Sequence, residues 1–276
     1  MVWWLNKAVG SLINLLFLPF SSLPPWVAML VISLLTALLM LFIYKKISNQ
    51  QGIRRVKNRL KASLLEIRLF QNDMRTQLQS QKELLSANLQ YLLYNLKPLL
   101  VMIWPIFLIL AQLNLWFASQ PPRPGETFLV KASFIKTVDL ERLNLDLEAP
   151  DGLLVETPPV RILDEGQVAW RLKVTGPVRE PLVIQVNGER YQKQIPAGKS
   201  RLSRVSAVRV KRNLWQELPY PGEKPLPADS LLKRIELNLQ PQRLSLAGIG
   251  LHWLLAYFLL SVILGLALKG LFRVEI

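Results

Sequence analysis

The chain offers few side chains that could carry out chemistry. Its 276 residues contain no cysteine and a single histidine, His252. Neither a glycine-rich phosphate loop nor a Gly-x-Ser-x-Gly nucleophile motif occurs in the sequence. His252 stands beside Trp253 at the start of an apolar run, a position typical of an anchor at the membrane surface. We therefore expect a protein that is not an enzyme and has no catalytic residues, metal site or cofactor.

Four carboxylates, Asp139, Glu141, Asp146 and Glu148, lie close together in the sequence. Their segment has the alternation of a strand, which points successive side chains to opposite faces. Solvated charge is therefore the better interpretation of these residues than a calcium or acid–base site.

Polar residues inside apolar runs are the more informative group. Counted along three apolar helices, they fall about 10 Å from one end of each. Such residues either hold helices together or line a polar recess that lowers the cost of bringing another chain's polar parts into the bilayer. Pro105, in the middle of one run, would remove a helical hydrogen bond and could help to open such a recess. The candidate recess residues are Ser33, Thr36, Gln112, Asn114, Tyr257 and Ser261.

The elements that carry these residues indicate a membrane protein, because 51% of the chain is hydrophobic and this content is concentrated in long runs. We predict transmembrane helices at 26–44, 98–118 and 247–270, each close to the ~20 residues needed to cross the hydrocarbon. Residues 1–25 could form a signal peptide, a short span or an interfacial helix. Without a basic start or a small-residue cleavage site, an amphipathic helix lying in the interface is favoured.

Residues 45–97 alternate between charged and apolar positions with helical spacing. Ile53, Val56, Leu60, Ile67, Phe70 and Met74 step by three and four residues with Ser63 in one slot, and Leu85, Leu89, Leu92 and Leu96 resume the pattern. The pattern predicts an antiparallel coiled-coil hairpin that turns at Asn72-Asp73, where Asn and Asp tolerate turn backbone.

The charge of this hairpin predicts the orientation. It contains eleven Lys or Arg against three acids, and such loops stay in the cytoplasm. The chain is then N-out and C-in, with residues 271–276 as a cytoplasmic tail, and a bacterial inner membrane is the expected location. The basic residues either contact lipid headgroups or bind a ribosome, without reading nucleic-acid sequence. They are Lys45, Lys46, Arg54, Arg55, Lys57, Arg59 and Lys61.

Residues 119–246 form an insertion between the second and third spans. Short segments of alternating polarity, separated by Gly, Pro or Asp-Gly, predict an all-β sandwich outside the cytoplasm. Strands are expected in 127–134, 144–149, 153–163, 167–176, 181–195, 201–210 and 234–241, and 217–230 is a Pro-rich loop or linker. Trp170 on a central strand and a hairpin at Asn187-Gly188 are similar to immunoglobulin-like domains, although the cysteine pair is absent.

The order of these elements resembles the YidC-type membrane protein insertases, in particular the three-span branch with the insertase subunit of the endoplasmic reticulum membrane complex and its archaeal relatives. The resemblance covers residues 1 to about 118 and 247 to 276, and includes the hairpin "IRRVKNRLKASLLEIRLFQNDMRTQLQSQKELLSANLQYLL". The spans lack the interior arginine of the bacterial members, and the β-domain is an addition.

The resemblance implies an insertase or intramembrane chaperone that works without hydrolysing ATP. Its partners would be membrane lipids, hydrophobic client polypeptides received at the hairpin and polar recess, and a ribosome bound through the basic arm. The alternative is a non-catalytic scaffold whose β-domain binds an envelope protein and whose coiled coil binds a cytoplasmic partner.

Overall fold

The computed structural model describes residues 2–20, 23–70, 72–136, 138–196, 202–246, 249–272 and 274–275. The chain divides into two compact units. The helical unit comprises residues 29–106 and 257–276, and the β unit comprises residues 1–28 and 107–256.

Three helices in the described part of the chain are long and apolar enough to cross a membrane: α2 (Pro25–Ile47), α4 (Met74–Phe117) and α6 (Trp253–Phe272). This agrees with the three predicted spans. The second span is not a separate helix, because α4 runs through the hairpin arm and the span without a break and contains Pro98 and Pro105.

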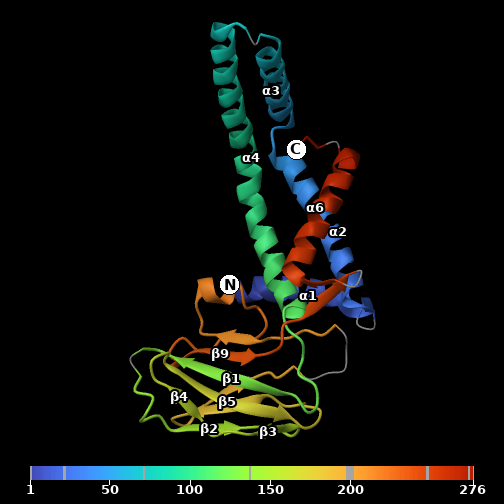
Figure 1. The fold of residues 1–276 in the computed structure, drawn as a ribbon. Helices are drawn as coiled ribbons and strands as arrows, with labels where there is room; N and C mark the ends of the chain where they lie inside the picture. Colours follow the sequence, from blue (N-terminus) through green and yellow to red (C-terminus); the bar gives the residue numbers. More distant parts are fainter. Residues whose placement is uncertain are drawn as a thin grey trace. The chain divides into compact units, whose positions relative to one another are not determined.

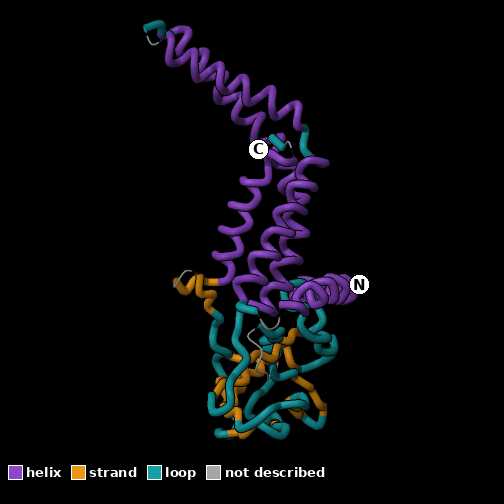
Figure 2. Tube along the Cα trace, turned by 90° about the vertical axis from the view of Figure 1, so that its right-hand side faces the viewer, coloured by secondary structure: helices purple, strands orange, loops and turns teal. Residues whose placement is uncertain are grey.

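The predicted hairpin consists of α3 (Gln50–Leu69) and the first part of α4, which lie side by side in Figures 1 and 2. Each arm begins with a side-chain cap. The Asn49 side chain accepts a hydrogen bond from the Gly52 N–H at 2.9 Å, and Asp73 accepts from the Arg75 and Thr76 N–H groups at 3.1 and 3.4 Å. Asn72-Asp73 lies at the turn, as predicted, beside Gln71, which is outside the described residues.

The seam between the arms differs from the prediction. On α3, Ile53, Val56 and Ser63 are buried as expected, whereas Phe70 and Met74 near the turn are exposed. On the hairpin arm of α4, before Pro98, Ser80 and Ala87 are buried, and the Ser80 hydroxyl donates to Glu66 at 2.9 Å. The buried side chains on the α4 side of the seam are thus small. The predicted stripe on α4 was therefore wrong, and the four leucines that formed it are 48 to 68% exposed: Leu85, Leu89, Leu92 and Leu96.

The base of the hairpin contacts the end of the chain. Ile53 packs with Leu41, Tyr44 and Val274 in one buried cluster. The Lys57 ammonium lies 3.3 Å from the Glu275 carboxylate, whose residue also donates its backbone N–H to the Gln50 side chain at 2.7 Å. Arg273 and Ile276 of the predicted tail lie outside the described residues.

In the β unit, α1 (Val2–Phe17) and the short 3-10 helix η1 (Leu18–Phe20) precede α2. Residues 1–25 thus contain the predicted helix, whose placement in the membrane interface stays a prediction. α1 runs crosswise to the end of α4 (Figure 1), with the Phe17 ring edge-on to Trp116 and Phe117 at centroid distances of 5.1 and 5.8 Å. Leu12 and Leu15 of α1 are exposed.

The remainder of this unit is an antiparallel β-sheet domain. One sheet has the order β3-β5-β1-β9-β8 with β4 also paired to β5, and a second has the order β2-β6-β7. Both sheets contribute to one core, in which Trp170 on β5 is 1% exposed. The strands are β1 (Thr127–Phe134), β2 (Leu145–Glu148), β3 (Leu153–Val155), β4 (Val160–Ile162), β5 (Gln167–Val174), β6 (Leu182–Val186), β7 (Glu189–Lys193), β8 (Val208–Val210) and β9 (Leu232–Asn238).

The predicted hairpin between β6 and β7 is confirmed, since Asn187 and Gly188 have φ values of 48° and 88°, as this tight turn requires. Residues 153–163 split into two strands around Pro158-Pro159. In 201–210 only β8 is a strand, and Arg201 is outside the described residues. The Pro-rich loop is anchored by Leu226, which is fully buried in the core.

The third span begins later than predicted. The strands β10 (Arg243–Leu246) and β11 (Ile249–His252) pair antiparallel where its first turn was expected, and α6 starts at Trp253. Gly250 lies within β11, and glycine is a poor helix former. The predicted starting residues Ala247 and Gly248 lie outside the described part of the chain.

Candidate functional site

Four of the six polar candidates belong to the helical unit. Ser33 and Thr36 lie on α2, Tyr257 and Ser261 lie on α6, and all but the half-buried Ser261 are buried. The Thr36 hydroxyl donates to the Ile32 carbonyl of its own helix at 2.8 Å. This bond to its own backbone agrees with the alternative prediction for Thr36, in which the hydroxyl serves helix structure rather than lining a recess.

Three hydroxyls of this group keep unused hydrogen-bonding capacity. Within the described residues, those of Ser33, Tyr257 and Ser261 are buried without a partner of ordinary geometry, although Tyr257 lies near Thr36 and Ser261. A buried polar group without a partner costs roughly 1–3 kcal/mol. The α2–α6 hydroxyl cluster (Ser33, Thr36, Tyr257 and Ser261) therefore keeps unused hydrogen-bonding capacity inside the helical unit.

Gln112 and Asn114 belong to the β unit, whereas the other four candidates belong to the helical unit. Gln112 is fully buried, and its side-chain amide donates to the Asn6 carbonyl of α1 at 2.9 Å. Asn6 in turn donates to the Glu217 carbonyl at 3.3 Å. Asn114 is half-buried. Sequence reasoning missed Asn6 as the partner of Gln112, although a buried amide in an apolar helix signals a need for one.

The predicted basic contact residues lie on the surface of the helical unit at the base of the hairpin. Lys57 is half-buried and paired with Glu275. The others are exposed and so can meet lipid headgroups or another anionic partner: Lys45, Lys46, Arg54, Arg55, Arg59 and Lys61.

The four exposed leucines of α4 belong to a longer apolar face of this helix, which the sequence reasoning did not identify. Exposed apolar residues follow one face of this helix from the hairpin arm into the apolar span, with a heptad-like step and Lys82 in one slot. From Leu78 to Ile103 this leucine face extends about 37 Å at the rise of an α-helix. Its members are Leu78, Leu85, Leu89, Leu92, Leu96, Leu99 and Ile103, each 48 to 68% exposed.

The predicted acidic residues and His252 take part in local pairs and a helix cap. Among described residues no group of three or more His, Cys, Asp or Glu side chains could hold a metal ion. Asp139 pairs with Arg142 at 3.4 Å, and Glu148 pairs with Arg190. The His252 ring accepts a hydrogen bond from the Leu254 N–H at 3.3 Å, which caps the start of α6.

Comparison of the chain with protein-family models, with curated proteins and with solved structures returned no match.

Proposed function

We propose that the protein is a membrane protein insertase or intramembrane chaperone of the YidC type. The leucine face of α4 carries the proposal, because one unbroken helix presents exposed apolar side chains both on the hairpin and in the span. Monomeric soluble surfaces rarely expose contiguous apolar patches of this length, and such patches mark interaction sites. A hydrophobic client segment bound on the hairpin can move along the same face toward the lipid.

The polar and basic groups have complementary roles in this proposal. The basic arm, which carries Arg54, Arg55 and Arg59, attracts anionic headgroups at ~1 kcal/mol per residue near the surface, or an anionic ribosome. The α2–α6 hydroxyl cluster offers hydrogen bonds to a client's polar flank and lowers its cost of entry. The proposal also assigns the hairpin as a cytoplasmic coiled coil, the β unit as an immunoglobulin-like sandwich outside the cytoplasm, and the location as a bacterial inner membrane.

Site-specific photo-crosslinking during synthesis of membrane proteins tests the proposal. A probe at Leu89 should capture many nascent membrane proteins, whereas a probe at its exposed neighbour Gln90, which points about 100° away, should capture few. Equal capture at both positions would contradict the role of the leucine face.

A matched pair of triple variants separates this face from general apolarity. Replacing Leu85, Leu89 and Leu92 with Ser should reduce client insertion severalfold. The same change at Leu64, Leu65 and Leu69, which are equally exposed on α3, should leave insertion near the original level. The opposite ranking would rule out α4 as the client path.

A scaffold is the second candidate. Leu154 on β3, Val160 on β4 and Leu163 are 52 to 54% exposed, although they belong to the β-domain rather than to an apolar helix. An envelope protein could cover these side chains. A single recurrent partner captured from Leu154, with no client captured at Leu89, would favour the scaffold.

A further inference from the structure

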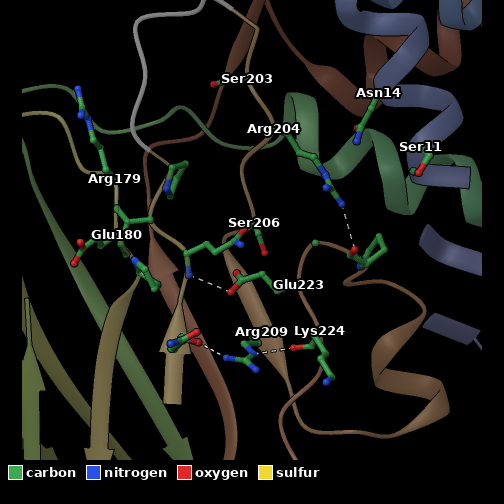
Figure 3. A pocket seen from close by; sticks show the side chains of 18 residues that line it. Ser11, Asn14, Arg179, Glu180, Ser203, Arg204, Ser206, Arg209, Glu223 and Lys224 are labelled. Carbon is green, nitrogen blue, oxygen red and sulfur yellow. Dashed lines mark hydrogen bonds between the residues drawn. The ribbon is translucent and has the colours of Figure 1, made fainter. Parts of the chain in front are cut away.

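The β unit contains a cavity of about 810 Å³ that plays no part in the proposed client path. Figure 3 shows its wall. Gly10, Ser11 and Asn14 of α1 form one side, and segments around β7, β8 and the Pro-rich loop form the other. Its charged lining comprises four cations and two carboxylates: Arg179, Arg204, Arg209, Lys224, Glu180 and Glu223.

The central carboxylate, Glu223, is already neutralised. The Lys193 side chain is fully buried and forms an ion pair with Glu223, whose other oxygen accepts the Gln194 N–H at 3.1 Å. The Lys193 ammonium also donates to the Ser206 carbonyl at 2.5 Å. Burial lowers the pKa of Lys193, and the contact with Glu223 opposes this shift. Glu223 also attracts the two guanidinium groups beside it, but its hydrogen bonds go to Lys193 and Gln194 rather than to them.

Those two guanidinium groups bind only neutral acceptors in the described part of the chain. Arg204 donates to the Pro221 carbonyl at 3.3 Å, and Arg209 donates to the Lys224 carbonyl at 2.8 Å and to the Gln192 carbonyl. Both groups keep further N–H donors, and a carbonyl does not balance their charge. Glu180 and Arg179 are exposed at the edge of the cavity. The cavity thus has an excess of positive charge and free donors.

The cavity also adjoins a surface suited to lipid. α1 contributes Asn14 to the lining, while its own Leu12 and Leu15 are 69 and 68% exposed. A helix with this arrangement lies in the headgroup region of a bilayer with its apolar side in the acyl chains. A phosphate bound near Asn14 would then belong to a molecule whose acyl chains continue past α1.

We propose that this cavity binds the phosphate group of an anionic glycerophospholipid. Arg204 and Arg209 donate to the phosphate oxygens, because a planar guanidinium matches their geometry and charge. The polar glycerol headgroup occupies the remaining space near Asn14 and Ser203. Their side-chain oxygens are buried and have no hydrogen-bond partner in the described parts of the chain. The proposal goes beyond client insertion and does not depend on it.

Native mass spectrometry of the full chain in detergent, titrated with phosphatidylglycerol or phosphatidylcholine, tests this site. Both lipids carry the phosphate, so the comparison tests the headgroup and the net charge. Phosphatidylglycerol should bind at least about tenfold more tightly than phosphatidylcholine, because the excess positive charge of the cavity repels the choline cation, whereas glycerol hydroxyls can form hydrogen bonds with Asn14 and Ser203. Arg204→Gln should remove most of this preference, and Arg204→Lys should keep part of it. Arg142→Gln, which removes an exposed arginine elsewhere in the same domain, should have no effect.

Three outcomes would overturn the proposal: equal binding of the two lipids, an equal loss in Arg204→Gln and Arg142→Gln, or inorganic phosphate binding as tightly as phosphatidylglycerol. The last result would assign the cavity to a free anion. Arg204 and Lys224 are both exposed lining residues, so if Arg204→Gln alters the circular dichroism spectrum, Lys224→Gln provides the same test at the second position. The client-insertion variants on α4 should keep full lipid preference, so this proposal and the proposed function can fail separately.

Discussion

At the scale of single residues, the ion pair between Lys193 and Glu223 organises one side of the cationic cavity. Removing one partner of a buried pair leaves the other charge without compensation, which costs about 3–5 kcal/mol. We expect Glu223→Gln to lower the free energy of unfolding of the β-domain by about 3–5 kcal/mol. Thermal unfolding of the full chain, followed by circular dichroism, measures this loss.

Two further variants complete this test. Lys193→Met combined with Glu223→Gln should recover most of the loss, because no buried charge remains. Glu180→Gln, at an exposed carboxylate of the same cavity, should be nearly neutral. A double variant no more stable than Glu223→Gln alone would show that the pair acts through its hydrogen bonds rather than its charge.

Asp73 gives a pH-dependent start to α4. Hydrogen bonds from Thr76 and Arg75 lower the pKa of this carboxyl from its usual 3.8. The ionised Asp73 side chain therefore stabilises the start of α4 fully at pH values above 3.8. This stabilisation is lost as the pH falls through the lower pKa that Asp73 has in the folded protein. We expect NMR signals of the first turn of α4 to lose their helical shifts over that acidic window, and Asp73→Ala to lose them at neutral pH. Asp151→Ala should not affect this turn.

Removing a buried hydroxyl of the α2–α6 cluster should affect client insertion without affecting the stability of the protein. Because the Tyr257 hydroxyl has no partner of ordinary geometry among described residues, Tyr257→Phe should not lower the melting temperature. The same change should slow insertion of clients with polar flanks. Tyr94→Phe, on the exposed part of α4, is the control. A large loss of stability in Tyr257→Phe would indicate a packing role instead.

At the scale of elements, the seam between α3 and α4 contains a small side chain on α4. Ala87 is fully buried in the seam, so Ala87→Leu should overpack it and push the arms apart. Spin labels placed at Lys61 and Lys82 should then show a longer and broader distance distribution. Ala62→Leu, at an exposed position of α3, should leave the distance unchanged.

The errors in prediction follow the same physical logic. The strand 127–134 was located residue for residue, because period-2 alternation and glycine turns leave little choice of register. On α4, two patterns with helical spacing interleave, the leucines and the small residues around Ser80 and Ala87. Hydrophobicity assigned the leucines to the seam, whereas the buried pattern is the one with the small residues. An apolar residue that is exposed for contact with a partner looks the same in the sequence as one that packs in the core.

At the scale of the whole molecule, the number of spans was predictable from length and apolarity, whereas the hydrogen-bond partners of the polar residues in the spans were not. Depth along a span says nothing about which way a residue faces. Gln112 bonds to α1 in the β unit, while Ser33 and Tyr257 belong to the helical unit. That distinction requires the rotation of each helix, which tertiary packing sets.

The N-out, C-in orientation has a direct test, since the chain has no native cysteine. Single cysteines at Gln81 on the hairpin and at Arg171 on the β-domain are both exposed. An impermeant thiol reagent added to intact spheroplasts should label Arg171→Cys and should label Gln81→Cys only after lysis. The reverse result would invert the topology.

The two prolines of α4 lie on the side of the helix opposite to the leucine face. Pro98 lies two positions after Leu96, and Pro105 lies two positions after Ile103. Two positions correspond to a rotation of about 200° around an α-helix. Each ring crowds the carbonyl four residues earlier, so bending opens the proline side and closes the opposite side. The leucine face lies on the closing side. A client segment would therefore contact the concave side of a bent helix, where bending brings successive leucines closer to one another.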